Sequence, residues 1–519
     1  MSGLFGTFNV AVKGLNANQT ALHTTSHNIS NANTEGFNRQ RVELKADTPF
    51  NLSGVGQLGT GVKLESVVRM VDEFVDLQIR KESSVLENYT AQNDIMGQIE
   101  MIFNEPSNTG LNFAMSEMFN AWQELSKNPE SQNAQSMVAE KSKTFADALN
   151  HMAIQAKELK GDVADNIDKS IYDVNSLIGQ LNTVNDQIFN ISVKGQSPND
   201  LMDTRDLLMK KISGLTEVKE SFDSWGRGII SIGGETVTGQ NAPKLSSVSG
   251  IIDNNDGTFK VNIHVGGDRS NSTPVTVSSA EIDKYKVGSP VLYSEGDGGT
   301  EAAIKPLEIT SGTIGGYITA NAEIDARIAE LDQFAKGAAN MVNTIHEGEN
   351  GVKFFTFTGA QTAENFTVNP DILSDESKVA TGVSVDSAAG DGSRALAIAN
   401  LRTTKVDFKS LSELSDLTAN GNYDAATMKF NYTSGSTMEG AYGDIVVKVG
   451  IRTEHAKNMV DNQSSVLAQL NNRRESVSGV SIDEEVTNLL KYQRSYEANS
   501  RVINTLNEML DTLINRTGV

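Results

Sequence analysis

The sequence predicts an α+β multidomain protein, in which a long coiled-coil-like helical stalk formed by both termini and internal helices carries two inserted mainly-β domains. Three observations predict this class. Apolar heptad repeats occupy both ends of the 519-residue chain, and internal tracts keep the same spacing of three and four. Two long regions between these tracts are instead rich in Gly, Ser, Thr and β-branched residues. Helical periodicity resumes after each region, which indicates that both are insertions.

The first thirty residues form an amphipathic helix with one apolar seam. The seam consists of Leu4, Phe8, Ala11, Leu15, Asn18, Leu22 and Ile29. Residues seven apart lie on one face of a helix and pack against a partner helix. Clustered Asn residues from Asn28 onward, followed by Gly36, predict that this helix ends there, because Asn and Gly favour the conformations found at helix ends.

A glycine-rich loop, Gly54 to Gly61, follows, and then a short strand from Val62 to Val67 leads into a helix that contains Val71 to Leu77. The loop matches G-x-G-x-x-G. A dinucleotide site needs a strand before that pattern and a helix directly after it. Here a strand follows, so the sequence favours a flexible turn.

Internal helical tracts form the rest of the predicted bundle. They run from about Phe145 to Ile191, from Leu201 to Leu215 after a break at Pro198, and from Ile324 to Ile345. The second tract begins with the charged cluster Asp200, Asp203, Arg205 and Asp206. Acid–base catalysis would need a cleft that separates carboxylate pKa values. Acidic residues in a first turn also stabilise the helix dipole, and this structural interpretation is favoured.

Histidine patterns are too sparse to indicate a metal site. His346-Glu347 begins like a zinc-protease helix, but Asn350 stands where the second histidine ligand should be, so a helix end running into a turn is favoured. His23 and His27 are four apart, yet no third ligand is suggested nearby. We expect no catalytic residue, no metal and no cofactor.

The β regions are expected at Phe222 to about Leu307 and at about Gly351 to Gly450. Asp256-Gly257 in the first is a hairpin signal, because the two residues separate apolar runs. The second ends in the β-branched run from Ile445 to Val449, which predicts a strand.

The last forty residues carry a second apolar seam. It consists of Ile482, Leu489, Tyr492, Tyr496, Asn499, Ile503, Leu506, Leu510 and Leu513. Ser481 and Glu484 form an S-x-x-E capping box, so the helix should begin at about Ile482. Asn18 and Asn499 interrupt the two seams. Each Asn either fixes helix register or lies at a local opening that meets water, and the sequence leaves both interpretations open.

These seams need partners. About eight buried seam side chains contribute roughly 2 kcal/mol each, whereas ordering thirty backbones costs about 1–2 kcal/mol per residue. Since isolated helices in water are marginal, we expect each end to fray until its seam is buried against the far end of this chain or against another copy. Assembly is therefore the first function to test.

Four domains are predicted. They are a terminal helical domain (1–60 with 479–519), a helical bundle (61–220 with 311–350 and 451–478), a β domain (221–310) and a second β-rich insertion (351–450). The net charge of −22 argues against nucleic acid as a partner. The longest apolar runs are far short of a membrane-spanning helix, and the N-terminus lacks the features of a cleavable secretory signal. Zero cysteines exclude disulfides.

Several segments resemble flagellar proteins. Asn28 to Arg39 resembles the signature of bacterial flagellar rod, hook and hook-associated proteins. Gly479 to Glu485 and Tyr492 to Leu513 are similar to the C-terminus of the hook-associated protein 1 family. Pro198 to Asp206 and Leu331 to His346 resemble the core of that family.

The resemblance implies a non-enzymatic structural subunit of the flagellum, needed for its assembly, at the junction between hook and filament. The terminal helices would pack in an inner tube within a ring of like subunits. Implied partners are the flagellar hook protein, a second hook–filament junction protein, and a flagellar export chaperone on the C-terminal helix. The chain would reach the extracellular flagellum by type III export without a cleaved signal peptide. Alternatives are another axial protein, such as a hook or rod subunit, or a flagellar protein whose β insertion acts as an adhesin or enzyme.

Overall fold

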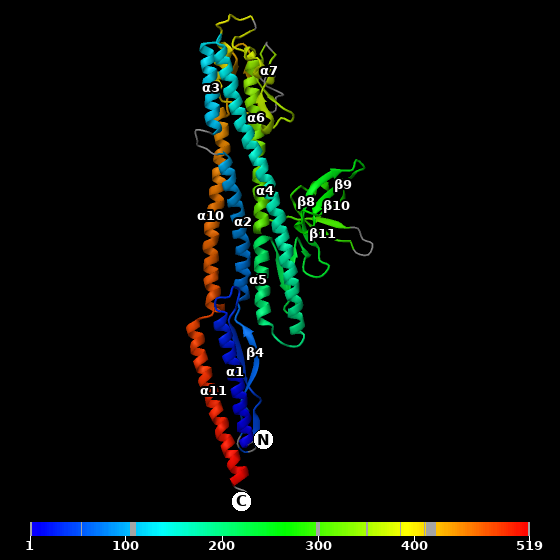
Figure 1. The fold of residues 1–519 in the computed structure, drawn as a ribbon, viewed down its shortest axis with the longest axis vertical. Coiled ribbons are helices and arrows are strands. Elements are labelled where there is room, and N and C mark those ends of the chain that lie inside the picture. The colour runs from blue at the N-terminus through cyan, green and yellow to red at the C-terminus, as the bar shows by residue number, and fades with distance from the viewer. Residues whose placement is uncertain are drawn as a thin grey trace. The chain divides into compact units, whose positions relative to one another are not determined.

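The computed structural model describes residues 3–516 except 53, 55, 104–109, 297–301, 349–350, 385, 409–410 and 412–421. The chain forms two compact units, each built from separate segments. The first comprises Met1–Glu87, Ser170–Ile314 and Asp461–Val519, and the second comprises Asn88–Lys169 and Gly315–Val460. Long helices with sheet-containing insertions confirm the predicted α+β class (Figure 1).

The α-helices are α1 (Leu4–Ser30), α2 (Glu73–Phe103), α3 (Leu111–Lys127), α4 (Gln132–Ser192), α5 (Asn199–Leu215), α6 (Gly312–Glu347), α7 (Pro370–Ser374), α8 (Ser393–Asn400), α10 (Met438–Ser478) and α11 (Ile482–Asp511). Shorter helical turns are η1 (Val265–Gly267), η2 (Ile282–Lys284), η3 (Ala363–Asn365), η4 (Glu376–Lys378) and η5 (Thr512–Arg516). The three internal tracts predicted from the sequence lie within α4, α5 and α6. Among the described residues, no helix combines the length and apolarity that crossing a bilayer requires.

The strands are β1 (Gln40–Ala46), β2 (Phe50–Leu52), β3 (Gly56–Leu58), β4 (Val62–Arg69), β5 (Lys219–Phe222), β6 (Gly228–Ile232), β7 (Glu235–Thr236), β8 (Lys244–Asp253), β9 (Thr258–His264), β10 (Ser272–Ser278), β11 (Pro290–Ser294), β12 (Ala303–Pro306), β13 (Phe355–Phe357), β14 (Phe366–Val368), β15 (Tyr423–Asp424) and β16 (Lys429–Phe430). The predicted strand at Val62 is present as β4. Within the glycine-rich stretch before it, Gly56–Leu58 forms β3, which pairs with β2, so the predicted flexible turn is partly a strand. Gly54 and Gly56 have positive φ angles of 85° and 104°.

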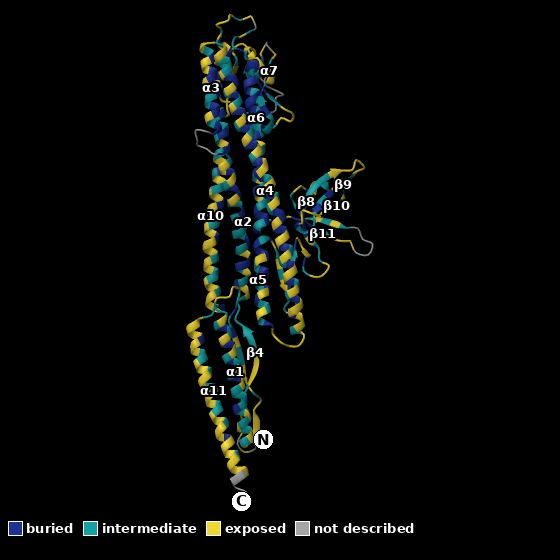
Figure 2. Ribbon diagram, viewed as in Figure 1, coloured by how far each residue is buried: buried dark blue, intermediate teal, exposed yellow. Residues whose placement is uncertain are grey.

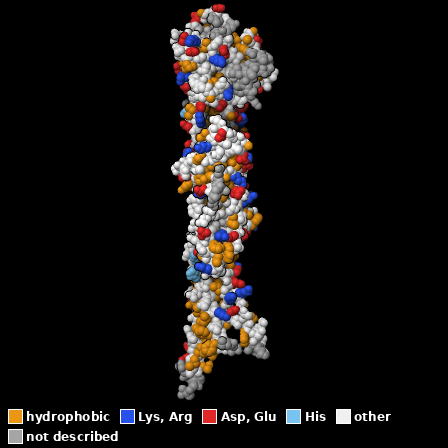
Figure 3. All heavy atoms as spheres, turned by 90° about the vertical axis from the view of Figure 1, so that its right-hand side faces the viewer, with side chains coloured by type: hydrophobic (Ala, Val, Ile, Leu, Met, Phe, Trp, Pro, Cys, Tyr) orange, Lys and Arg blue, Asp and Glu red, His pale blue; other side chains and the backbone are white. Residues whose placement is uncertain are grey.

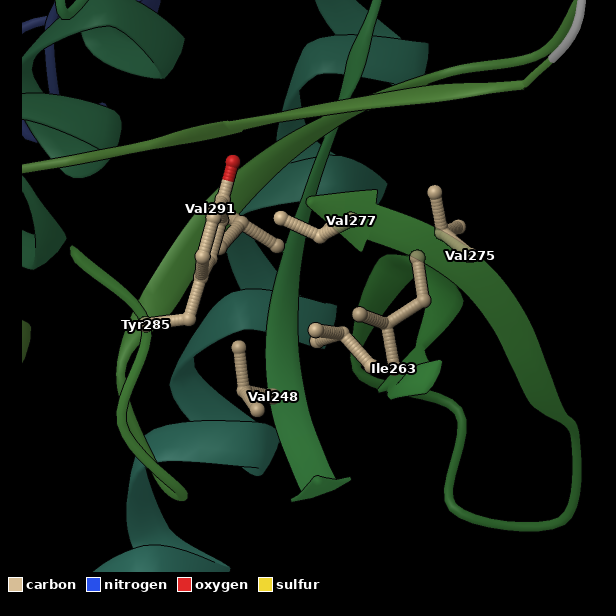
Figure 4. Close-up of a cluster of buried hydrophobic side chains, with 7 residues drawn as sticks. Val248, Ile263, Val275, Val277, Tyr285 and Val291 are labelled. Atoms are coloured by element: carbon tan, nitrogen blue, oxygen red, sulfur yellow. The ribbon is translucent and has the colours of Figure 1, made fainter. Parts of the chain in front are cut away.

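The first β insertion is confirmed. Five antiparallel strands lie in the order β10-β9-β8-β11-β12, and Gly257, with a φ of 85°, lies in the predicted turn between β8 and β9. A buried cluster forms its core, and Figure 4 shows these side chains turned toward one another. The cluster consists of Val248, Val261, Ile263, Val275, Val277, Tyr285 and Val291.

Asparagine side chains on α4 hold this insertion. The Asn185 amide donates to the Gly228 carbonyl and accepts from the Gly228 N–H, both at 2.8 Å. Asn175 pairs with Leu245 in the same way, at 2.8 and 3.2 Å. Each amide therefore pairs with one strand residue as a neighbouring strand would. Sequence periodicity could not reveal these contacts, because a lone Asn on a helix is usually solvated.

The second insertion requires a correction. The predicted strand from Ile445 to Val449 is wrong, because α10 already begins at Met438. Met438, Tyr442, Ile445 and Val449 are all buried, and their spacing of four, three and four is helical. Tertiary packing thus overrides the β propensity of the run. In the described residues of 351–437, strands occur only as the short pairs β13–β14 and β15–β16. The same segment also contains the helices α7 and α8. The four-domain division stays a prediction, but the helical segment that was predicted to begin at residue 451 begins at Met438.

Candidate functional site

The two terminal helices pack against each other within one chain. α1 and α11 lie side by side (Figure 1) and run antiparallel, because Gly14 contacts Asn499 whereas Asn28 bonds Glu485. The helices approach closely at Gly14, where an added Cβ would stand 3.0 Å from the Asn499 side chain. The far end of the same chain therefore supplies the partner helix that the seams require.

The predicted seam residues are covered unequally. Ala11 and Leu506 are buried, at 4% and 7% exposure, and most of the others are half-buried. The half-buried ones are Leu4, Phe8, Leu15, Asn18, Leu22, Ile29, Leu489, Tyr492, Tyr496, Asn499, Ile503 and Leu510. Ile482 and Leu513 are 51% and 57% exposed, so the seam within one chain does not use them. Figure 2 shows exposed residues along much of α11.

The two seam asparagines bond their own helices. Asn18 donates to the Gly14 carbonyl at 2.7 Å, and Asn499 donates to the Ser495 carbonyl at 3.0 Å. The Asn499 amide lies against Gly14, where an added Cβ would stand only 3.0 Å from its oxygen and nitrogen. The absence of a side chain at Gly14 therefore leaves room for the Asn499 amide.

We expect Gly14→Ala to weaken the α1–α11 pairing. Alanine favours an isolated helix by roughly 1 kcal/mol over glycine, but here its Cβ would push against Asn499. Gly179→Ala on α4 is the matched control, because nothing lies within 4 Å of its added Cβ, and it should stabilise by about 1 kcal/mol. Native-state hydrogen exchange measures the effect, in α1 and α11 amides for Gly14→Ala and in α4 amides for Gly179→Ala. Equal gains in protection from both variants would show that Asn499 does not restrict position 14.

The end of α1 is tied to β1 and α11 by Asn28. Its Nδ2 donates to the Gln40 carbonyl at 2.8 Å and to Glu485 Oε2 at 3.1 Å, and its Oδ1 accepts from the Gln40 N–H at 3.0 Å. Asn28 is 1% exposed and Glu485 is 2% exposed. The first residue of the predicted signature therefore connects three elements. α1 itself ends at Ser30, as predicted, but the positive φ of Gly36, 81°, lies in the following loop.

Arg39 completes this contact with the start of α11. Its Nη2 lies 2.7 Å from Glu485 Oε1, and its Nη1 lies 3.1 Å from Glu484 Oε2. The Arg39 N–H donates to the Ser478 carbonyl at 3.0 Å. Ser481 caps α11 by accepting from the Glu484 N–H, so the helix begins at Ile482 as predicted. The Glu484 side chain, expected to complete the capping box, instead pairs with Arg39.

Asp203 binds the same signature segment from α5. It accepts from the Asn38 N–H at 3.0 Å, from Asn38 Nδ2 at 2.7 Å and from Arg69 Nη1 at 2.7 Å. Arg69 also lies 2.8 Å from Asp206 Oδ2. Burial raises the pKa of Asp203, because it disfavours the charged form, while Asn38 and Arg69 act in the opposite direction.

Asp200 adds a third connection. It accepts from Gln40 Nε2 at 2.7 Å and lies 3.2 Å from His27 Nε2. The carboxylate cluster is thus structural, as favoured from the sequence, but its partners are polar groups of the N-terminal segment rather than only the helix dipole. We name this set the terminal joint. It comprises Asn28, Asn38, Arg39, Gln40, Arg69, Asp200, Asp203, Asp206 and Glu485.

His346, the first residue of the apparent zinc motif, is a buried structural residue near the end of α6. Its Nδ1–H donates to the Val352 carbonyl at 2.8 Å, and its Nε2 accepts from the Ala380 N–H at 3.0 Å. Both ring nitrogens are used by the neutral form. Burial lowers the pKa of His346 from 6.5 to about 4.

We therefore expect acid to destabilise the second unit. Between pH 6.5 and about 4 the unfolded chain takes up a proton at His346 and the folded chain does not. The contribution of neutral His346 to the free energy of unfolding is therefore fully present above pH 6.5 and is lost as the pH falls toward 4. The loss should be on the order of 3 kcal/mol. Thermal unfolding at pH 7 and pH 4.5 measures it. His151→Gln, an exposed control in the same unit, should keep the pH dependence, whereas His346→Gln should remove most of it.

The two chain ends pair, and a polar joint ties them to α5, which is the arrangement of a helical structural subunit. Three family models match: "Flagellar hook-associated protein FlgK helical domain" at residues 96–283, "Flagellar basal body rod FlgEFG protein C-terminal" at 474–516 and "Flagella basal body rod protein" at 8–38. The chain belongs to the flagellar hook-associated protein 1 family. It is 30% identical to flagellar hook-associated protein 1 of Bacillus subtilis, covering 100% of this chain and 99% of that protein.

Other relatives agree. Flagellar hook-associated protein 1 of Escherichia coli is 27% identical, covering 98% of this chain and 99% of that protein. The flagellar hook junction protein FlgK from Burkholderia pseudomallei has a similar fold, with a TM-score of 0.58 and 13% identity over 77% of this chain and all of that chain. The rod-protein models match only the chain ends, so the alternative of a hook or rod subunit finds no support.

Proposed function

We propose that this chain is a non-enzymatic ring subunit that joins the flagellar hook to the filament. The observation that carries the proposal is the terminal joint. It holds α1 and α11 together at one end, while α11 still presents large apolar side chains to solvent. Among these are Val486, Leu490, Val502 and Met509, which are 43–52% exposed. Apolar side chains repeated along one exposed helix are typical of protein contacts.

Assembly would cover what one chain leaves exposed. Most of the seam residues predicted from the heptad pattern are half-buried in the single chain, and Ile482 and Leu513 are exposed. Packing between copies would therefore stabilise the distal parts of both helices, consistent with the marginal stability of a two-helix pair. Neighbouring copies, the hook protein and a second hook–filament junction protein are the proposed partners.

The same exposed helix suits an export chaperone. An amphipathic helix with an apolar face is a common ligand for a partner groove, and α11 would present that face before the ring forms. We propose type III export without a cleaved signal peptide, and an extracellular location in the flagellum. Neither nucleic acid, membrane, metal nor cofactor is part of the proposed mechanism, and the β insertions are given no adhesive or catalytic role.

Deletion of Ile482–Val519 tests the proposal. We expect the hook to form and the filament to be absent from it, because the terminal layer loses half of its helix pair. Electron microscopy of isolated flagella and immunoblotting for the chain provide the readout. The amount of truncated chain in the medium distinguishes a defect in export from a defect in filament attachment. Filaments attached normally through the truncated chain would contradict the proposal.

A finer variant avoids removing a whole helix. Val502→Ser combined with Met509→Ser changes only exposed side chains of α11, so the monomer should keep its fold. We expect fewer attached filaments. Ile252→Ser is the matched control, because Ile252 is 53% exposed on β8 in the same unit but far along the chain from both termini.

A further inference from the structure

The terminal helices and the strands that follow α1 are joined to one another. α1 contacts α11 and also contacts β1 and β4. Asn28 bonds both Gln40 of β1 and Glu485 of α11, so the three elements share one anchor. Figure 3, viewed from the side of the strands, shows hydrophobic side chains gathered near this end of the chain. We name α1, the strands β1 to β4 and α11 together the terminal layer.

Two short connections join the terminal layer to the rest of the first compact unit. Residues 70–72 lead from β4 to α2, and residues 479–481 lead from α10 to α11. A capped helix follows each connection. Asp72 accepts from the Val75 N–H at 3.2 Å, and Ser481 caps α11. The layer therefore hangs on two segments of irregular backbone, each followed directly by a regular helix.

The Arg39 backbone holds these two connections side by side. Its carbonyl accepts from the Met70 N–H at 2.8 Å, and its N–H donates to the Ser478 carbonyl at 3.0 Å. Gly479, in the second connection, has no room for a side chain, because an added Cβ would overlap the Glu475 carbonyl oxygen. A few residues in such short segments are enough to absorb the backbone changes of a hinge. Two neighbouring connections define one axis about which the layer can turn.

The start of α5 binds the layer beside these connections. The Asp200 and Asp203 carboxylates accept hydrogen bonds from polar groups of the layer. Asn199 Nδ2 donates to the Val67 carbonyl of β4 at 2.8 Å. We name these contacts the latch. Hydrogen bonds and ion pairs need a narrow range of distances and angles, so a small turn of the layer would break the latch contacts together.

The latch contributes less to the closed arrangement than its number of contacts suggests. Asp203 is 6% exposed and the Arg69 side chain is 12% exposed. Removing paired charges from water costs free energy that offsets much of their attraction. Burial accordingly raises the pKa of Asp203. An arrangement that is favoured by a small free energy opens when other contacts favour the alternative.

We propose that the terminal layer turns as one body on its two connections, and that the start of α5 latches it in a single orientation in the free chain. Releasing the latch would let the layer tilt without loss of the α1–α11 pairing. The benefit to a junction rests on the proposed function. Neighbouring subunits could then set the tilt of the layer separately from that of the helices to which it is attached.

Distances between spin labels test the latch in the dilute full chain, which contains no native cysteine. One labelled pair, Asn16→Cys with Asp186→Cys, joins exposed positions on α1 and α4 of the same compact unit. A second pair, Asn16→Cys with Glu497→Cys, lies within the terminal layer. Double electron–electron resonance gives the distribution of each distance. We expect a narrow distribution from both pairs when the latch is intact.

Asp200→Ala combined with Asp203→Ala removes the acceptors of the latch. Ser30 and Asn16 lie about 21 Å apart along α1, so a turn of about 15° moves the label by about 5 Å. We expect the α1–α4 distribution to shift or broaden by at least that amount, and the α1–α11 distribution to stay unchanged. Asp483→Ala is the matched control, because it removes an exposed carboxylate at the start of α11 and should leave both distributions narrow.

Gln40→Leu combined with Arg69→Met releases the latch from the side of the layer and decides the matter if the aspartate variant fails to fold. An α1–α4 distribution that stays narrow in a folded latch variant would overturn the inference. An equally broad distribution with the latch intact would also overturn it, as would broadening of the α1–α11 distance in the same variant.

Failure of both latch variants to fold would show that these contacts hold the fold rather than an orientation, which also overturns the inference. Each of these measurements is made without assembly, so each leaves the proposed function standing. Filaments that attach without the chain would instead overturn the proposed function.

Discussion

Asp203→Ala should destabilise the terminal joint by about 2–3 kcal/mol, because it leaves two buried donors of Asn38 without an acceptor. The substitution would remove the acceptor of three hydrogen bonds, two from Asn38 and one from Arg69. Asp206 would remain beside Arg69, at 2.8 Å, but it cannot replace the two contacts to Asn38. Native-state hydrogen exchange of β1 and α1 amides in the full chain measures the loss as a fall in opening free energy.

Asp186→Ala is the control for this prediction. Asp186 is exposed on α4 in the same compact unit, so its removal should change opening free energies by no more than about 0.5 kcal/mol. Similar protection of α1 and β1 in both variants would mean that the joint does not hold the N-terminal segment.

Asn28→Leu should cost on the order of 3 kcal/mol, although leucine has nearly the same size. The change leaves the buried N–H and carbonyl of Gln40 without a partner and deprives Glu485 of a donor. Because Asn28 connects α1 with β1 and α11, we expect both terminal helices to lose protection together. Hydrogen exchange of peptides from α1 and α11 provides the measurement.

Asn33→Leu is a matched control within the same signature segment. Asn33 is exposed, whereas Asn28 is 1% exposed. The same substitution five residues away should therefore leave both helices protected. Loss of protection in α1 without loss in α11 would show that Asn28 supports only its own helix, which would contradict its role as a link.

Periodic apolar patterns predicted most of the fold. α1, α11 and the internal helices α4, α5 and α6 follow from repeats of three and four, because burial of one helix face decides their position. The start of α11 followed from Ser481, and the β8–β9 hairpin followed from Asp256-Gly257. The misassigned run from Ile445 to Val449 shows the limit of propensity, since Tyr442 and Met438 extend its buried face into a helix.

The joint was only partly predictable. Its residues appeared in the sequence as three separate signals: the Asn28 to Arg39 segment, the acidic start of α5 and the capped start of α11. Asp203 meets residues 134 and 165 positions away, and Glu485 meets Asn28 457 positions away. No local pattern encodes such pairings. An acidic helix start suggests a dipole effect, and only the fold shows that Asn38 and Arg69 lie beside it.

Amide hydrogen exchange, compared between the dilute monomer and assembled flagella, tests most directly the claim that one chain joins its terminal helices but leaves them for neighbours to complete. The account predicts protection in the monomer near Asn28 and Glu485, and weak protection toward Leu4 and Met509 that rises only after assembly. Uniformly strong protection along both helices in the dilute monomer, unchanged by assembly, would contradict it.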